Sequence, residues 1–293
     1  MKTVQSIGFL LTVFLFISCQ PDRKTAAQPV QKNIGIQMYS LRDDIGKNNE
    51  NVDSIIIKIG QIGYKYVETA SYWDGLIYGM TPEVFKAKIE AAGLSALSCH
   101  VSKNMSDNMD EVWAWWDKCI ASHKAAGMKL IVVPSMPTPE TLEGLQAICD
   151  YYNQIGEKCA AAGLKFGYHN HAYEFEKVYD DGTVMYNYMV EHTNPENVFF
   201  ELDVYWSQKG GYEASTLFEK YPGRFLALHI KDEAELIPDG YVNFEPVFTN
   251  ADKAGSKYLF VEVENYNMPP VESVKQSLDY LNGAAFVKDN YEE

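Results

Sequence analysis

From position 34 onward, short apolar runs alternate with longer stretches in which apolar residues recur every three or four positions. Short apolar runs are typical of strands buried on both faces, and the longer pattern is typical of amphipathic helices. Eight runs are candidate strands: 34–39, 64–69, 94–101, 130–134, 164–171, 198–203, 225–230 and 258–264. The alternation predicts a series of strand–helix units.

The predicted helices end in a recurring way. The clearest helical stretches are 82–92, 139–161 and 273–282. Ala-Gly pairs stand just before four of the predicted strands, and a glycine commonly ends a helix. Eight parallel crossover units close naturally into a barrel, whereas the alternative, a doubly wound sheet, lacks a GxGxxG motif after its first strand. We therefore predict an α/β fold, a single (β/α)8 TIM barrel.

The first 19 residues follow a different pattern. Lys2 precedes an almost entirely apolar run over 7–17, which is too short to span a bilayer comfortably and is typical of a secretory signal. The run ends in Phe-Ile-Ser-Cys, which resembles a bacterial lipobox with Cys19 as the lipidated residue. The alternative is a cleaved, soluble secreted form.

These features divide the chain into three parts. We expect a lipoprotein signal peptide over 1–19, a polar tether over 20–33 and the barrel domain over 34–293. The protein is then exported and anchored to the membrane through a lipid on Cys19, facing the periplasm or the cell surface.

Composition and charge narrow the functional classes. The chain has 40 acidic and 25 basic residues, a formal charge of −15, which excludes a general nucleic-acid binder because such proteins need a basic face. Hydrophobic residues make up 46%, far too many for a disordered chain. No CxxC pair is present, so we expect the four remaining cysteines to be small buried apolar residues: Cys99, Cys119, Cys149 and Cys159. In a periplasmic protein one disulfide is the alternative, but the spacing does not indicate a pair.

Polar residues gather at the ends of the predicted strands, where the active site of a TIM barrel lies. They include Glu68, His100, His169, His171, Glu174, Glu201, Asp203, His229, Lys231, Glu262 and Glu264. Any one of them has an ordinary structural explanation, such as a hydrogen bond or a helix cap. Together, however, the carboxylates would repel one another in one mouth, and a divalent metal would remove that penalty. Mixed carboxylate and imidazole ligands suit Mn2+, Mg2+, Co2+ or Zn2+.

Four runs of the sequence that contain these polar residues resemble motifs of a known family. YHNHAYEFE, FFELDVYWSQKGG, RFLALHIKDE and YLFVEVENY are similar to motifs of the sugar phosphate isomerase/epimerase family, the xylose isomerase-like TIM barrels, and in particular of its YHNHxxEF subgroup. The resemblance covers roughly residues 34–285. It implies the barrel and a metal site but leaves the reaction open, because the family includes epimerases, isomerases, dehydratases, lyases and endonuclease IV.

Carried onto this sequence, the resemblance implies one divalent metal ion with four ligands. Three positions match directly: Asp203, His229 and Glu262. For the fourth we expect Glu174, and the alternatives are His169 and His171. The family's bases are typically carboxylates that also touch the metal, so Glu174 and Glu262 are the expected catalytic pair for proton transfer.

Other strand-end residues are candidates for substrate contacts. Imidazole, ammonium and carboxylate groups can bond sugar hydroxyls, and aromatic faces suit the C–H faces of a sugar ring. The candidates are Glu68, His100, His169, His171, Tyr205, Trp206 and Lys231. Lys231 could stabilise a developing enolate oxygen, or could simply form an ion pair with a neighbouring acid.

We therefore expect a metal-dependent isomerase or epimerase that forms an enediolate from a free sugar or sugar derivative. A sugar phosphate is a poorer candidate, because the sequence lacks an obvious glycine-rich phosphate loop or late arginine cluster. The alternatives are a lyase or hydrolase acting on 3-keto-glycosides and a non-catalytic sugar-binding lipoprotein. Nuclease activity is disfavoured by the acidic charge and by the low count of six histidines.

Overall fold

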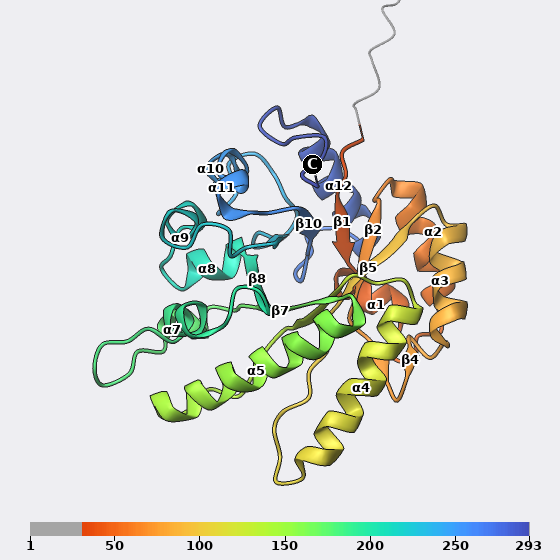
Figure 1. Ribbon diagram of the computed structural model, residues 1–293. Coiled ribbons are helices and arrows are strands. Elements are labelled where there is room, and N and C mark those ends of the chain that lie inside the picture. Colours follow the sequence, from red (N-terminus) through yellow and green to blue (C-terminus); the bar gives the residue numbers. More distant parts are fainter. Residues whose placement is uncertain (1–30, 293) are drawn as a thin grey trace, which may run out of the picture.

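Eight parallel strands surround a common axis in the computed structural model, which describes residues 31–292 (Figure 1). The strands are β1 (Gly35–Gln37), β2 (Tyr66–Thr69), β5 (Ser95–Cys99), β6 (Leu130–Val133), β7 (Lys165–His169), β8 (Val198–Asp203), β9 (Ala227–Ile230) and β10 (Tyr258–Val261). Each falls within one of the eight runs predicted from the sequence. The hydrogen-bonded order is β5-β2-β1-β10-β9-β8-β7-β6, so the (β/α)8 prediction is confirmed.

The two ends of this order, β5 and β6, nearly close the barrel. They meet at an isolated parallel bridge between His100 and Val132, just beyond the end of β5. The amide of Val101 donates to the carbonyl of Val132 at 2.9 Å, and that of Lys129 donates to the carbonyl of Leu97 at 2.9 Å. The β5–β6 seam therefore has a shorter ladder than the other strand pairs.

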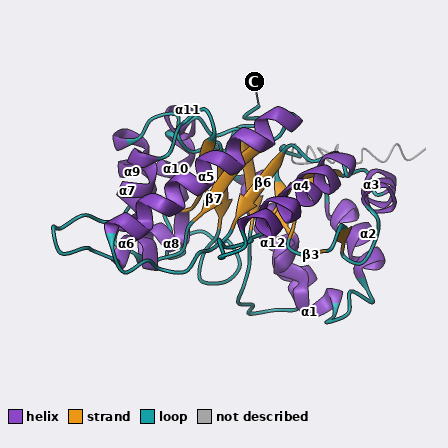
Figure 2. Ribbon diagram, turned by 60° about the horizontal axis from the view of Figure 1, so that its bottom comes forward, coloured by secondary structure: helices purple, strands orange, loops and turns teal. Residues whose placement is uncertain are grey.

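Helices surround the strands on the outside (Figure 2). They are η1 (Met38–Leu41), α1 (Arg42–Ile45), α2 (Val52–Ile62), α3 (Pro82–Ala91), α4 (Met109–Ala125), α5 (Leu142–Ala162), α6 (Tyr173–Glu176), α7 (Met185–His192), α8 (Val204–Lys209), α9 (Ala214–Lys220), α10 (Phe244–Thr249), α11 (Ala251–Ala254) and α12 (Pro270–Gly283). A short hairpin, β3 (Tyr72–Trp73) and β4 (Leu76–Ile77), follows β2. Within residues 31–292, no helix combines the length and the apolar character that crossing a membrane requires.

Helix α5 shows how the sequence sets these boundaries. The side chain of Thr141 accepts a hydrogen bond from the amide of Gly144 and caps the first turn. Gly163 ends the helix in the left-handed conformation, at φ +83°, which glycine adopts without a steric penalty. The residues between them bury an apolar stripe against the barrel, including Leu145 and Ile155.

The barrel interior is apolar at one end and polar at the other. Tyr66, Phe199 and Phe260 belong to a small buried cluster distinct from the main core. Because alternate residues of a strand point to the same side, Glu201 and Glu262, each two positions further along, face the same interior. Strand alternation thus fills one end of the barrel interior with apolar side chains. It places charged side chains at the other end, where the strands end.

The last two residues of the predicted tether, Lys32 and Asn33, are part of the folded domain. Lys32, placed in the tether by the sequence, is 5% exposed, and its Nζ donates to the carbonyl oxygen of Leu281 at 2.9 Å. The amide of Asn33 donates to the carbonyl of Asp289 at 2.7 Å, so these two positions belong to the folded domain. The expected signal peptide and Cys19 lie outside the described residues.

The cysteine prediction is confirmed. Four cysteines of the barrel are buried, and none forms a disulfide: Cys99, Cys119, Cys149 and Cys159. Burial raises the pKa of each thiol, so each remains a neutral apolar group in the core.

Candidate metal centre

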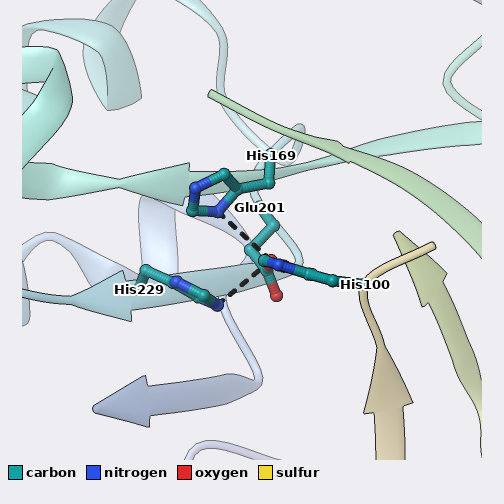
Figure 3. A group of neighbouring side chains, drawn as sticks. All are labelled: His100, His169, Glu201 and His229. Atoms are coloured by element: carbon teal, nitrogen blue, oxygen red, sulfur yellow. Dashed lines mark hydrogen bonds and ion pairs between the residues drawn. The ribbon is translucent and has the colours of Figure 1, made fainter. Parts of the chain in front are cut away.

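Two overlapping groups of side chains meet where the barrel strands end, and in each group four ligand atoms lie within 4.8 Å of one another. The upper group consists of His169, Asp203, His229 and Glu262. The deeper group consists of His100, His169, Glu201 and His229, and Figure 3 shows its three imidazoles turned toward Glu201. Both groups combine imidazole nitrogens and carboxylate oxygens, which are common metal ligands.

The upper group contains polar atoms that have no partner. Oδ1 of Asp203 accepts the amide hydrogen of Trp206 at 2.8 Å and caps α8, but the buried Oδ2 has no hydrogen bond. Nδ1 of His169 is buried and has no hydrogen bond of good geometry, although it lies 3.4 Å from Oε2 of Glu201. Nδ1 of His229 lies 3.3 Å from Oε2 of Glu262. Buried polar atoms normally have partners, and these donors are the kinds that bind divalent transition metals, so the upper group fits such a cation.

The turn after β7 is tied to the end of β8. The side-chain amide of Asn170 donates to the carbonyl of Asp203 at 3.2 Å, and the amide of Asp203 donates to Oδ1 of Asn170 at 3.0 Å. This reciprocal pair fixes the spacing between His169 and Asp203, which belong to neighbouring strands.

The deeper group is a hydrogen-bonded network. Oε2 of Glu201 lies 2.8 Å from Nε2 of His100, 3.2 Å from Nε2 of His229 and 3.4 Å from Nδ1 of His169. Oε1 of Glu68 lies 2.7 Å from Nε2 of His229 and 3.0 Å from Nε2 of His100. Two buried carboxylates therefore share the same two imidazoles.

Burial and charge oppose each other in this network. Burial alone lowers the pKa of His100, but the Glu68 and Glu201 carboxylates outweigh it and raise the pKa to about 9. The pKa of His229 is also raised, because its carboxylate neighbours outweigh burial. For His169, burial and the charge of His229 together hold the pKa well below its usual value. His100 and His229 are therefore protonated more readily than a free histidine, whereas the adjacent His169 stays neutral.

Lys231 brings a positive charge to the rim of the upper group. Its ammonium lies 3.1 Å from Oε2 of Glu262, forms an ion pair with Glu264 and lies 5.4 Å from the ring centre of Trp206. Burial raises the pKa of a carboxyl, but Lys231 and His229 outweigh it at Glu262 and hold that pKa well below its usual value. The pKa of Asp203 rises to about 7, because burial outweighs the effect of Lys231.

A cavity of about 480 Å3 opens above these groups. Its polar wall includes His100, His169, His171, Glu262 and Glu264. Tyr39, Tyr72 and Trp115 provide aromatic surface on the same wall. A cavity of this size with a few converging polar groups suits a small polar ligand.

Glu174 does not lie where the sequence placed it. Its Oε1 accepts the hydroxyl hydrogen of Tyr168 at 2.6 Å, and its Oε2 accepts the amide hydrogen of His171 at 2.8 Å. Both oxygens are thus used within the turn after β7, and Glu174 belongs to neither candidate metal group. In the upper candidate group the fourth side chain is His169, one of the two alternatives considered for that position.

The expected substrate contacts are placed at different depths. His100 and His171 line the cavity, whereas the fully buried Glu68 lies in the network below it. The indole of Trp206 packs against His171, with ring centres 5.7 Å apart, and against Tyr205 at 4.9 Å. Tyr205, Trp206 and Lys231 do not line the cavity itself.

Sequence reasoning gave no role to several residues that build this site. Glu201 was noted only as a strand-end residue, although its position two residues before Asp203 places it on the same strand face. Gln37 and Ser98 bond Glu68, and Trp115 reaches the cavity from α4. For these three residues the sequence offered no comparable signal.

Comparison with known proteins decides the family. Residues 57–284 match the sequence profile described as xylose isomerase-like TIM barrel. The chain belongs to this family. The resemblance inferred from the four sequence runs is therefore confirmed, while membership of the YHNHxxEF subgroup stays a prediction.

Solved structures and a characterised relative are similar over most of the chain. A crystal structure of a sugar phosphate isomerase/epimerase from Parabacteroides distasonis ATCC 8503 is 34% identical, with a TM-score of 0.80 over 88% of this chain and 100% of that chain. A structure of L-ribulose 3-epimerase, 14% identical, has a TM-score of 0.66 over 85% of this chain and 93% of that one, and shows the fold alone. Inosose dehydratase of Geobacillus kaustophilus (strain HTA426) is 23% identical over 68% of each chain.

Proposed function

We propose that this member of the xylose isomerase-like TIM barrels is a divalent-metal-dependent isomerase or epimerase of a free sugar or sugar derivative. The observation that carries the proposal is the upper group, His169, Asp203, His229 and Glu262, buried at the base of a polar cavity with unpartnered donor atoms. Support also comes from the similar proteins, several of which are epimerases or isomerases by name.

The roles of the protein's own residues follow from their charges. A divalent cation held by the upper group would polarise a sugar carbonyl and so acidify the adjacent C–H bond. Glu262 stays ionised because of Lys231 and His229, and it accepts the proton from that carbon. The ammonium of Lys231 does not line the cavity and acts through Glu262, whose negative charge it stabilises from 3.1 Å away. Return of the proton to the other face or to the adjacent carbon gives epimerisation or isomerisation.

The cavity wall favours a neutral substrate. Glu262 and Glu264 both line the cavity, and its described lining includes neither Arg nor Lys. A phosphate group entering there would meet carboxylates, and the imidazolium of His100 in the wall is already paired with Glu68 and Glu201. A free sugar, whose hydroxyls bond imidazole and carboxylate groups, suits the same wall.

A second candidate is an elimination reaction. The relative from Geobacillus kaustophilus is an inosose dehydratase, an enzyme named for removing water. Elimination begins with the same removal of a proton next to a carbonyl, so Glu262 could serve either reaction. An elimination on a 3-keto-glycoside would release an aglycone in place of water.

Metal binding is tested first, by elemental analysis and by thermal unfolding with and without Mn2+, Mg2+, Co2+ or Zn2+. We expect about one ion per chain and a rise in Tm on addition of the ion. Asp203→Ala and His229→Ala should abolish both effects, because each removes a donor and leaves buried charge uncompensated. Asp252→Ala is the control, because this exposed carboxylate pairs with Lys288 and belongs to neither candidate metal group. Full occupancy in His229→Ala would contradict the ligand assignment.

The reaction is tested by incubating the metal-loaded protein with free sugars and 3-keto-glycosides in D2O. Deuterium entering a sugar that is otherwise intact supports isomerisation or epimerisation. Release of water or of an aglycone supports the elimination instead. Bound metal together with tight sugar binding, but with no deuterium entering any sugar and no product released, would favour a non-catalytic sugar-binding protein.

A further inference from the structure

His229 belongs to both candidate metal groups and faces them with different nitrogens. Its Nδ1 lies 3.3 Å from Oε2 of Glu262 in the upper group. Its Nε2 lies 2.7 Å from Oε1 of Glu68 and 3.2 Å from Oε2 of Glu201 in the deeper network. A cation can bind only a ring nitrogen that has lost its hydrogen, so the tautomer of the ring in the metal-bound state decides which group can use His229 as a ligand.

The shortest contacts differ between the two groups. Two ligands of one tetrahedral cation, each about 2.1 Å from it, lie about 3.4 Å apart. The 3.3 Å between Nδ1 of His229 and Oε2 of Glu262 matches that spacing. In the deeper group, Oε2 of Glu201 lies at similar distances from His229 and His169, 3.2 and 3.4 Å, but its 2.8 Å contact with His100 is a hydrogen-bond length. The 2.7 Å between Nε2 of His229 and Oε1 of Glu68 is a hydrogen-bond length too.

Charge leads to the same assignment. Nε2 faces two carboxylate oxygens, at 2.7 and 3.2 Å, whereas Nδ1 faces one, at 3.3 Å. The single hydrogen of a neutral ring therefore gains more on Nε2, where it is donated to the closer pair of carboxylates. A ligating histidine almost always donates its other N–H to a carboxylate, a carbonyl or water. Both carboxylates at Nε2 are fully buried: Glu68 and Glu201 are each 0% exposed.

The two carboxylates are also held in place independently of His229. Gln37 donates from Nε2 to Oε1 of Glu68 at 2.7 Å, and the hydroxyl of Ser98 donates to its Oε2 at 2.5 Å. His100 bonds Glu201 at 2.8 Å and stacks on His229 with ring centres 5.1 Å apart. The acceptors are therefore arranged before any cation binds.

We propose that Glu68 and Glu201 are positioning residues that keep a hydrogen on Nε2 of His229. Nδ1 then presents its lone pair to a cation that Asp203 and Glu262 also bind. The cation then binds in the upper group, and the deeper network supports it without holding metal. The inference rests on the metal-binding part of the proposed function, and it assigns Glu68 a role different from substrate contact.

The direct test uses the wild-type protein, labelled with 15N-histidine and loaded with 113Cd2+. We expect a 113Cd coupling on Nδ1 of His229 and a retained hydrogen on its Nε2, read from long-range 1H–15N spectra. The His229 signals are assigned with a His229→Asn sample. A cadmium coupling on Nε2 of His229, or on Nε2 of His100, would overturn the inference while leaving metal binding intact. Failure to bind any cation would instead overturn the proposed function.

Variants test the contribution of the carboxylates. A glutamine at 68 or 201 can turn its NH2 group toward Nε2, which then permits the other tautomer. The double variant Glu68→Gln/Glu201→Gln should weaken metal affinity by about 10–100-fold, the usual effect of losing such partners. Glu235→Gln is the matched control, because Glu235 is a buried carboxylate that bonds Asn267 outside the site. Unchanged affinity in a folded double variant would contradict the inference.

Discussion

At the scale of single residues, the salt bridge between Lys231 and Glu262 decides how the site can react. Burial of a lone carboxyl favours its neutral form, and Asp203 shows this, with its pKa raised to about 7. Glu262 is equally buried, but the nearby ammonium holds its pKa well below the usual value. One carboxyl of the upper group is therefore a ready proton acceptor at neutral pH, while the other depends on a cation for its charge.

We predict that Glu262→Gln lowers proton exchange without abolishing substrate binding. A carboxamide keeps the shape and one oxygen donor but cannot accept a proton at neutral pH. With metal in excess, deuterium exchange from D2O into the substrate should fall by a factor on the order of 100 or more. Glu264→Gln, which loses a carboxylate paired with the same lysine, is the control and should retain most of the exchange. Near-normal exchange in Glu262→Gln together with lowered exchange in Glu264→Gln would move the catalytic role to Glu264, which also lines the cavity.

Part of the site could be predicted because strand alternation and spacing are visible in a sequence. Asp203, His229 and Glu262 end neighbouring strands on the interior face, so both the motifs and the barrel geometry indicated them. The position of Glu174 could not be predicted, because it depends on how a turn folds back after β7. The network of His100 and Glu201 also escaped prediction, since the 2.8 Å contact joins residues about a hundred positions apart.

At the scale of elements, the helices tolerate change according to what they pack against. Gly156 lies in the middle of α5, where a Cβ would stand 2.3 Å from the backbone oxygen of Asn197. Gly283, at the end of α12, has open space at the same position. The two glycines therefore differ in packing although both are helical.

We predict opposite effects for alanine at these two positions. Gly156→Ala gains about 0.5–1 kcal/mol of helix propensity, but the overlap with backbone should cost about 1–3 kcal/mol, so the variant is destabilised. Gly283→Ala should be neutral or more stable by up to about 1 kcal/mol. Chemical denaturation of both variants measures the difference. A stabilised Gly156→Ala would show that α5 can shift away from Asn197.

Helix α4 contains a buried histidine, His123, that should make the stability of the protein depend on pH. His123 is 0% exposed, its Nδ1 lies 2.7 Å from the carbonyl of Cys119, and burial lowers its pKa to about 4. The unfolded chain, with an ordinary pKa of about 6.5, binds this proton more readily. Protonation therefore favours unfolding, and stability should fall as pH drops from about 6.5 to about 4.

We predict that His123→Gln removes this part of the acid sensitivity. The difference in free energy of unfolding between wild type and variant should change by up to about 3 kcal/mol across that range, and should be constant above pH 7. The adjacent Tyr72 and Cys119 stay neutral there, because burial raises the pKa of both. Parallel pH profiles for the two proteins would contradict the assignment of this effect to His123.

The eight barrel strands were predictable because each is buried on both faces and reads as an apolar run. The β3–β4 hairpin was not predicted, although an Asp-Gly pair between apolar residues is a typical signal of a two-residue hairpin turn. There the left-handed Asp74 and Gly75, at φ +48° and +93°, make the turn. It turns Trp73 outward, 81% exposed, while Tyr72 lines the cavity.

At the scale of the whole molecule, the net charge of −15 bears on membrane attachment. An acidic protein is repelled by anionic lipid surfaces, so the barrel is not expected to bind a membrane by itself. The expected attachment depends on Cys19, which lies outside the described residues.

We predict that Cys19→Ala moves the protein from the membrane fraction to the soluble fraction. Cys149→Ala, which changes a buried cysteine of the barrel, should leave the fractionation unchanged. Mass spectrometry of the mature wild-type chain should show loss of the first 18 residues and an added lipid. Unchanged fractionation of Cys19→Ala, with Met1 still present, would contradict the lipoprotein hypothesis.

The short ladder between β5 and β6 has a consequence for how activity is lost. Local opening of a protein starts where few backbone hydrogen bonds hold an edge, well below the free energy of global unfolding. His100 takes part in the isolated bridge to Val132 and also contacts Glu201. Opening of this seam would pull an imidazole out of the network and admit water beneath it. Mild denaturant should therefore inactivate the protein while its helical circular dichroism signal is still native.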